Sequence, residues 1–259
     1  MRIARFTDGA DPRYGVVEGE PGEEQIVVLA GDPLYTPISP TGQRVPLSSV
    51  RLLAPVIPRS KIVAVGKNYA DHAAEMGGEV PSRPLLFFKP NTSVIGPDDA
   101  IVIPAITSEV HYEAELAVVI KRICKNVPAS GAADVILGYT CANDVSARDL
   151  QREDGQWARA KGLDTFCPLG PWIETDLDVS DLAVTAYRDD EQVQAGRTSD
   201  MVFGVPEIIE FVSAAFTLLP GDVILTGTPA GVGPIEPGQR IEIEVEGIGA
   251  LSNPVVARG

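Results

Sequence analysis

Short apolar runs bounded by Gly and Pro dominate the hydrophobic pattern of this chain, and they predict a protein built mostly of β-strands. We predict buried strands at 62–65 and 85–88, where the runs are apolar on both faces, and a longer strand at 135–145. Alternation of Ile and Val with Glu over 241–246 predicts a strand with one exposed face. Residues 188–191 separate two β-like runs and predict a hairpin.

Helical periodicity is rarer than strand periodicity. One amphipathic helix is predicted from about Pro206, which suits a first helical turn. A short helix is predicted over 68–76, and a polar helix from an N-cap at Ser146 to about Trp157. Because strands outnumber helices and do not alternate with them, we predict an α+β, strand-rich fold with a mixed, mainly antiparallel sheet.

The first part of the chain differs in composition from the rest. Residues 1–58 are rich in Gly and Pro, and the stretch at 33–58 is predicted to be a connection laid over the surface. From Lys61 onward the apolar runs are longer. We therefore predict a small N-terminal β module at 1–58 and a main domain at 59–259. The N-terminal module contains short runs of β type, at 3–6, 14–17 and 25–29.

Charge and composition exclude several classes of protein. Lys and Arg number 21 against 36 Asp and Glu, which gives a net charge of −15 that repels phosphate backbones and argues against nucleic-acid binding. No apolar run approaches the ~18 residues of a membrane span, and the first residues lack the apolar region of a signal peptide. The 3 cysteines form no close pair, so we expect free thiols and a cytosolic protein.

Two carboxylates, Glu113 and Glu115, stand at the start of a segment that ends in a continuous apolar run. We predict one strand over 111–120, with both carboxylates on the face that carries Ala117 and Val119. Alternate carboxylates on a strand lie about 6–7 Å apart, close enough for both to reach one hard cation. For such a pair alone, a solvent-facing position at a strand end is the alternative.

Asp144 closes the predicted strand at 135–145, just before a helix, where an Asp is commonly a cap. With Glu113 and Glu115 it would complete an oxygen-ligand site for Mg²⁺, Mn²⁺ or Ca²⁺ that leaves positions for water and substrate. The sequence contains 2 histidines, His72 and His111, which excludes a histidine-rich zinc site.

Three further patterns offer candidate chemistry. His72 and Glu75 are three residues apart on the predicted short helix, and a carboxylate beside an imidazole suits the activation of water. Lys161 could neutralise an oxyanion. Thr228, in the segment T-G-T-P-A-G-V-G, could bind a carboxylate together with backbone amides. Each pattern also occurs without function, as a surface pair, a solvated lysine or a turn, and the last segment lacks the G-K-[ST] of a nucleotide loop.

Taken together, the order and spacing of six motifs resemble the fumarylacetoacetate hydrolase superfamily. The resemblance covers about residues 60–256 and is most marked for the branch of acylpyruvate hydrolases, oxaloacetate decarboxylases and 2-hydroxyhepta-2,4-diene-1,7-dioate isomerases. It implies a mixed β-sheet roll with flanking helices, usually a homodimer. Fumarylacetoacetase itself has an extra metal carboxylate without a counterpart here. The motifs are N-Y-x-x-H-x-x-E, L-L-F-F-K-P, H-Y-E-x-E-L, N-D-V-S-A-R-D-L-Q, K-x-x-D-T and T-G-T-P-x-G-V-G.

The resemblance assigns roles residue by residue. It implies that Glu113, Glu115 and Asp144 bind Mg²⁺ or Mn²⁺. It also implies that His72 and Glu75 activate water, on a segment that closes as a lid over the substrate.

The remaining motif residues would surround the substrate. The resemblance implies that Lys161 stabilises an enolate, that Arg148 and Gln151 line the pocket, and that Thr228 holds the substrate carboxylate. His111 opens its motif and is expected to lie outside the ligand set.

Three functions remain open at this point. The first is metal-dependent cleavage of a C–C bond, by hydrolysis or decarboxylation, in a 3-acylpyruvate-like 2-oxo acid through an enolate. The second is isomerisation of a 2-hydroxy-diene dioate, which would differ in the residues that contact the far end of the substrate, expected in the 77–84 loop with Arg83 as one candidate. The third, a catalytically idle metal-binding scaffold, is disfavoured because His72, Lys161 and the three carboxylates are all present.

Overall fold

A computed structural model describes residues 1–258. Its α-helices are α1 (Ala70–Glu75), α2 (Arg148–Asp154), α3 (Ala158–Lys161) and α4 (Val205–Ala215), and short 3₁₀ turns lie at Leu47–Ser49, Asn91–Ser93, Ala129–Val135 and Thr198–Asp200. Its strands are β1 (Arg2–Thr7), β2 (Arg13–Glu18), β3 (Gln25–Leu29), β4 (Pro40–Pro46), β5 (Arg51–Leu53), β6 (Ile62–Gly66), β7 (Leu85–Lys89), β8 (Val94–Ile95), β9 (Ile101–Ile103), β10 (Val110–Tyr112), β11 (Ala114–Ile120), β12 (Ile136–Asn143), β13 (Ser146–Ala147), β14 (Cys167–Glu174), β15 (Ala183–Arg188), β16 (Glu191–Arg197), β17 (Val223–Leu225), β18 (Gly233–Pro234), β19 (Arg240–Val245) and β20 (Gly249–Ala257).

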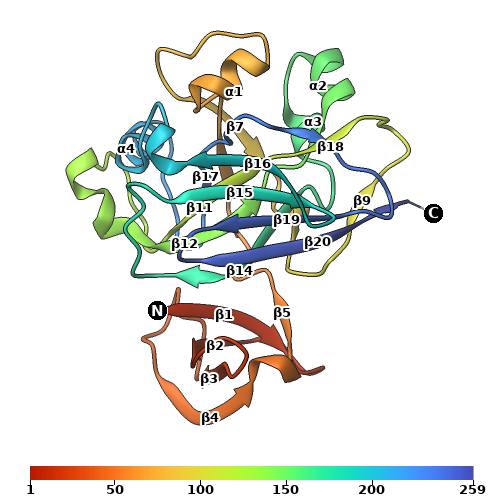
Figure 1. The fold of residues 1–259 in the computed structure, drawn as a ribbon. Coiled ribbons are helices and arrows are strands. Elements are labelled where there is room, and N and C mark those ends of the chain that lie inside the picture. The colour runs from red at the N-terminus through yellow and green to blue at the C-terminus, as the bar shows by residue number, and fades with distance from the viewer. Residues whose placement is uncertain (259) are drawn as a thin grey trace.

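The strands of residues 1–258 form three sheets (Figure 1). The largest has 12 strands and follows the path β4-β3-β2-β1-β14-β12-β11-β17-β6-β7, with β5 paired to β1 and β8 to β14. A 5-stranded sheet has the order β16-β15-β19-β20-β9, and a 3-stranded sheet the order β13-β10-β18. Parallel pairs are β6–β17, β8–β14 and β9–β20, among mainly antiparallel ones. The predicted α+β, strand-rich fold with mixed sheets is confirmed.

The central strand β11 is buried on both faces, which explains its continuous apolar run. Leu116 and Val118 belong to the core that the large sheet shares with α4 and the 5-stranded sheet. Ala117 and Val119 belong to the core on the opposite face of β11. Full burial of a large aliphatic side chain is worth about 1.5–3 kcal/mol, so this strand is firmly held. The polar residues that directly precede β11 are therefore attached to a rigid strand.

Several predicted elements are confirmed. The hairpin is β15–β16, and its turn residues Asp189 and Asp190 have φ angles of 49° and 69°. The alternating strand is β19, whose Ile and Val side chains are buried while Glu244 is exposed. The amphipathic helix is α4, with Pro206 in its first turn. Among the described helices, none has both the length and the apolar character that a membrane crossing demands.

The prediction of a single strand over 111–120 is wrong. The chain leaves the small sheet after β10, and Glu113 joins β10 to β11 in the large sheet. The backbone amide of Glu113 donates to the side-chain oxygen of Asn143 (3.0 Å), while its carbonyl accepts from the amide of Asp144 (2.9 Å). Polar contacts from the end of β12 therefore replace regular strand pairing at this residue, and a pattern of apolar residues does not report such contacts.

Three other expectations are also corrected. Strand β7 is not buried: it is an edge strand, and Leu85 and Phe88 are 40% and 42% exposed. Ser146 is not an N-cap, because it lies in β13 and its hydroxyl donates to the carbonyl of Asp144. The polar helix to Trp157 is divided into α2 and α3, since Gly155 adopts a left-handed conformation at the end of α2.

The N-terminal strands extend the large sheet. Strands β1, β2 and β3 lie where the short β-like runs predict them, but the stretch at 33–58 contains β4 and β5 and is not merely a connection. Ile3 of β1 pairs with Ile173 of β14. In Figure 1 these strands lie at the bottom, while α1 and α2 lie on the opposite side of the molecule. The N-terminal strands also have a small core of their own, formed by Ala4, Phe6, Val17, Ile26 and Val28.

Candidate active site

A cavity of about 300 Å³ lies between α1, α2, α3, the β10–β11 junction and the loop after β17. Its size is typical of sites for small molecules. The cavity brings together residues that are more than 150 positions apart in the sequence, from Val65 to Thr228. Of the residues for which the sequence predicts a role, those that line the cavity are His72, Glu113, Glu115, Asp144, Arg148, Gln151, Lys161 and Thr228.

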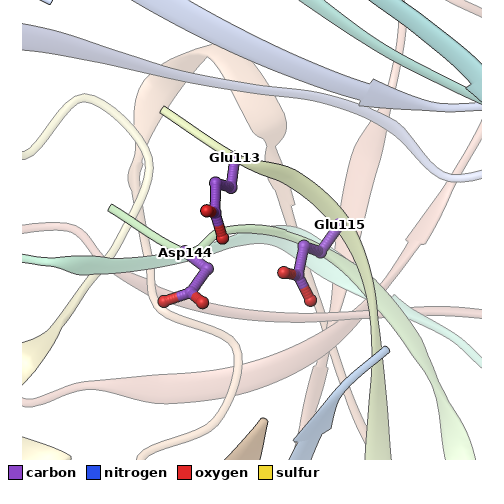
Figure 2. A group of neighbouring side chains, drawn as sticks. All are labelled: Glu113, Glu115 and Asp144. Atoms are coloured by element: carbon purple, nitrogen blue, oxygen red, sulfur yellow. The ribbon is translucent and has the colours of Figure 1, made fainter. Parts of the chain in front are cut away.

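Three carboxylates that line the cavity lie close together (Figure 2). Glu113 comes from the β10–β11 junction, Glu115 from β11, and Asp144 from the residue after β12. Each offers an oxygen within 4.8 Å of the others, and the exposed fractions of the residues are 4%, 2% and 1%. The break between β10 and β11 places Glu113 in the junction, outside the strand that carries Glu115.

Three cations surround two of these carboxylates. The guanidinium of Arg148 donates to Glu113 (2.7 Å), and the ammonium of Lys161 donates to Glu113 (2.6 Å) and Asp144 (2.8 Å). The other oxygen of Asp144 accepts from the buried Lys89 ammonium at 2.6 Å. Buried charges need such partners, since an unpaired one costs several kcal/mol.

Glu115 has a different environment. It accepts a hydrogen bond from the backbone amide of Gly227 (2.6 Å), and no Lys or Arg of residues 1–258 forms an ion pair with it. Burial raises the pKa of Glu115 well above its usual range, and the neighbouring Asp144 and Glu113 carboxylates raise it further. Glu115 is therefore the carboxylate that lacks a counter-charge.

The pKa values of its neighbours Glu113 and Lys161 are shifted in the directions that favour their charged forms. Burial alone would raise the pKa of Glu113, but Lys161 and Arg148 hold it well below its usual range. Burial would likewise lower the pKa of Lys161, but Asp144 and Glu113 raise it above its usual value. Glu113 is therefore a carboxylate and Lys161 an ammonium at neutral pH.

A divalent cation fits this group of carboxylates. The donors are oxygens, which hard cations such as Mg²⁺ and Mn²⁺ prefer. The position between Glu113 and Asp144 already stabilises one cation, the Lys161 ammonium. The buried Glu115 lacks a counter-charge that a divalent ion would supply. Glu113, Glu115 and Asp144 can therefore bind a divalent metal.

The predicted pair of His72 and Glu75 forms on α1. Nδ1 of His72 lies 3.2 Å from the Glu75 carboxylate, and His72 lines the cavity with 6% exposure. Glu75 does not line the cavity; its carboxylate also accepts from the backbone amide of Gly231 (3.1 Å). The amide fixes Glu75, and Glu75 fixes the ring of His72, so the imidazole has a defined orientation.

The other predicted residues also have defined contacts. Arg148 donates to the side-chain oxygen of Gln151 (2.9 Å) as well as to Glu113. The Thr228 hydroxyl accepts from Nε2 of Gln194 (2.6 Å), so its own proton is free to be donated into the cavity. His111 does not line the cavity, and burial together with Arg148 lowers its pKa, which favours a neutral ring.

The predictions from the sequence missed two residues that hold the site together. Lys89 binds Asp144, and Gln194 binds both Thr228 and the backbone amide of Ala114 (3.1 Å). A lysine that directly follows an apolar strand is expected to be buried, and a buried ammonium needs a carboxylate partner. Lys89 could therefore have been predicted as a site residue. Gln194 gives no such signal, because the hairpin that carries it is remote in the sequence.

The chain is similar in sequence to known proteins over its whole length. Residues 61–256 match the family "Fumarylacetoacetate (FAA) hydrolase C-terminal", and residues 1–55 match "Rv2993c-like, N-terminal". Protein Rv2993c of Mycobacterium tuberculosis is 54% identical over 100% of this chain and 99% of its own length. The human mitochondrial oxaloacetate tautomerase FAHD2A is 44% identical over 82% of this chain and 71% of its own length.

The chain is also similar to solved structures of enzymes. A 5-carboxymethyl-2-hydroxymuconate delta-isomerase from Mycobacterium smegmatis is 51% identical, with a TM-score of 0.93 and 100% of both chains covered. A maleylpyruvate hydrolase from Sphingobium sp. SYK-6, in complex with manganese(II) and pyruvate, is 35% identical with a TM-score of 0.82, again over 100% of both chains. The chain therefore belongs to the fumarylacetoacetate hydrolase family of enzymes.

Proposed function

We propose that this protein is a divalent-metal-dependent enzyme that acts on a 2-oxo acid, or its 2-hydroxy-diene form, through an enolate. The observation that supports this most is the convergence of three buried carboxylates, the Lys161 ammonium and the oriented His72 in one small cavity. Mg²⁺ or Mn²⁺ bound by the carboxylates would act as a Lewis acid that stabilises negative charge on the substrate oxygens.

In this proposal each of the other site residues has a separate role. Lys161 stays protonated and donates a hydrogen bond to the enolate oxygen. Thr228, whose hydroxyl proton is free, donates to the substrate carboxylate. His72 accepts a proton, either from the substrate carbon or from a water molecule, while Glu75 keeps its ring in place. Arg148 and Gln151 form one side of the pocket and restrict how the substrate can turn.

Among the candidate reactions, we consider proton transfer the best supported. In that case the enzyme interconverts enol and keto forms, or isomerises a 2-hydroxy-diene acid. The relatives at 44% and 51% identity that are named as a tautomerase and an isomerase support this choice. Cleavage of a C–C bond in a 3-acylpyruvate-like acid, by hydrolysis or decarboxylation, is the second candidate, and the His72–Glu75 pair supports it because it suits water activation.

Turnover by metal-stripped protein tests the proposal. We expect the loss of enol oxaloacetate, of a 2-hydroxy-diene dioate or of acetylpyruvate to depend on added Mg²⁺ or Mn²⁺, and Glu113→Gln to abolish it in a folded protein. Glu244→Gln is the matched control, because Glu244 is exposed on β19 and should leave turnover unchanged. Full activity of Glu113→Gln with added metal would refute the site.

We also propose that two copies of the chain associate. Edge strand β7 supports this, because it carries Leu85 and Phe88 at 40% and 42% exposure, and exposed apolar edges tend to be covered. Sedimentation equilibrium of the purified chain tests the proposal, and a mass equal to 27.5 kDa at all concentrations would refute it.

A further inference from the structure

We infer that Lys67 holds a second carboxylate at the far end of the substrate, so that the enzyme selects dicarboxylic over monocarboxylic 2-oxo acids. The inference rests on the proposed function, in which the other end of the substrate meets the three acidic residues. Four cationic side chains line the cavity: Lys67, Arg148, Arg152 and Lys161.

Three of these four cations already have carboxylate partners. Arg148 and Lys161 bind Glu113, and the exposed Arg152 binds Glu109 at 2.5 Å. Within residues 1–258, Lys67 forms neither an ion pair nor a side-chain hydrogen bond. It is thus the one cavity-lining cation of the described chain whose charge is available to a ligand, in a protein of net charge −15.

The Lys67 ammonium packs close to the backbone at Gly78. A Cβ atom at Gly78 would lie 2.3 Å from the Lys67 ammonium nitrogen, so the missing side chain at Gly78 makes room for the charge. Gly78 follows α1, the helix that carries His72. The Lys67 ammonium therefore lies against the turn that follows this helix.

The backbone of Lys67 points to the same conclusion. Its φ angle is +56°, in the left-handed region that Gly or Asn adopts more readily than Lys. Residues held in this region by their surroundings concentrate at ligand sites. A lysine here places a long cationic side chain at the end of β6, where a smaller residue would satisfy the backbone better.

Part of the cavity lining is apolar. Met76, Phe87 and Trp157 line it, and the rings of Phe87 and Trp157 pack edge to face at 5.2 Å. Such a wall suits the carbon chain of a ligand with a polar group at each end. Arg83, in the loop where the sequence led us to expect this contact, is exposed and does not line the cavity.

Matched pairs of ligands that differ in one carboxylate test the inference. 2-Oxoglutarate and 2-oxopentanoate have the same chain length, as do 2-oxoadipate and 2-oxohexanoate, but only the first of each pair has a second carboxylate. Binding is measured by calorimetry with Mn²⁺ present. We expect the unsubstituted protein to bind at least one diacid roughly 10- to 100-fold more tightly than its partner, the range for a hydrogen bond between charged groups.

Variants assign the preference to one side chain. Lys67→Met removes the charge at similar length and should abolish the preference by weakening the diacid alone, whereas Lys67→Arg should retain it. Arg83→Met is the matched control and should bind like the unsubstituted protein. Thermal unfolding confirms that each variant is folded.

The outcomes separate the two proposals. Equal binding of diacid and monoacid, or a preference that survives in Lys67→Met, would overturn the role of Lys67 alone. Binding of neither 2-oxo acid in the presence of Mn²⁺ would overturn the proposed function, and the inference with it.

Discussion

The three buried carboxylates have the same chemistry but different neighbours. Glu113 and Asp144 are neutralised by lysine and arginine, and the pKa of Glu113 is lowered as a result. Glu115 meets a single backbone amide, and burial raises its pKa. A bound divalent cation would supply Glu115 with the counter-charge that it lacks, whereas Glu113 and Asp144 already have lysine or arginine partners.

The pair of His72 and Glu75 can be tested by substitution of a single side chain. We expect His72→Ala to reduce metal-dependent turnover by roughly 10²–10⁴-fold, because a positioned general base contributes about that much. Mn²⁺ affinity should remain unchanged, since His72 is not among the carboxylates that would bind the metal. Steady-state kinetics and calorimetry measure the two quantities.

The second histidine is the control for this test. His111→Ala removes the same side chain outside the cavity and should retain turnover. If His72→Ala were as active as the unsubstituted enzyme, the pair would have no part in the reaction.

At the scale of the element, Asp149 holds α2 to the loop between β9 and β10. The Asp149 carboxylate accepts from the Thr107 hydroxyl and from the backbone amides of Ser108 (2.8 Å) and Leu150 (2.9 Å). Burial alone would raise the pKa of Asp149, but these hydrogen bonds lower it to about 2. They fix the start of the helix that positions Arg148 over the carboxylates.

The lowered pKa predicts how stability depends on pH. We expect Asp149→Ala to lower the free energy of unfolding by about 1 kcal/mol at pH 7, a modest value because the side chain is partly exposed to solvent. The folded-state pKa lies below the unfolded value of about 3.9, so the contribution is complete above that value and is lost as the pH falls toward about 2.

Urea unfolding of both proteins between pH 2 and 7 measures this difference. The exposed Asp11→Asn serves as the control and should change stability by less than about 0.5 kcal/mol. A difference between the Asp149→Ala and unsubstituted proteins that stayed constant down to pH 2 would contradict the assignment.

Elements were predictable from the sequence where burial alone determines them. The alternation in β19 and the helical spacing in α4 follow from one buried face each. The break at Glu113 was not predictable, because it depends on Asn143, a residue 30 positions away. Periodicity reports which face of an element is buried, but it does not report a polar contact that ends the element.

At the scale of the whole molecule, the sequence predicted most residues of the candidate site, because those residues lie within short motifs. It did not locate Lys67 or Lys89 as members of the site. The contact of Lys89 with Asp144 spans 55 positions, and the cavity around Lys67 exists only once α1, β7 and α3 have packed together. Charge partners that meet through folding cannot be assigned from local patterns.

The shared sheet predicts that the N-terminal strands are needed for stability although they lie far from the cavity. Ile3 packs in the same core as Ile62 and Ile173, and β1 covers the edge of β14. Removal of residues 1–58 would expose that apolar surface and leave β14 unpaired on one side.

We therefore expect a fragment of residues 59–259 to unfold at a lower temperature than the full chain and to aggregate, as measured by thermal unfolding and light scattering. The residues that line the cavity all lie between Val65 and Thr228, so any folded fraction should still bind Mn²⁺. A fragment with the melting temperature of the full chain would mean that the pairing of β1 with β14 contributes nothing to stability. A folded fragment without Mn²⁺ binding would mean instead that the N-terminal strands also shape the site, through β14 and β12, which ends one residue before Asp144.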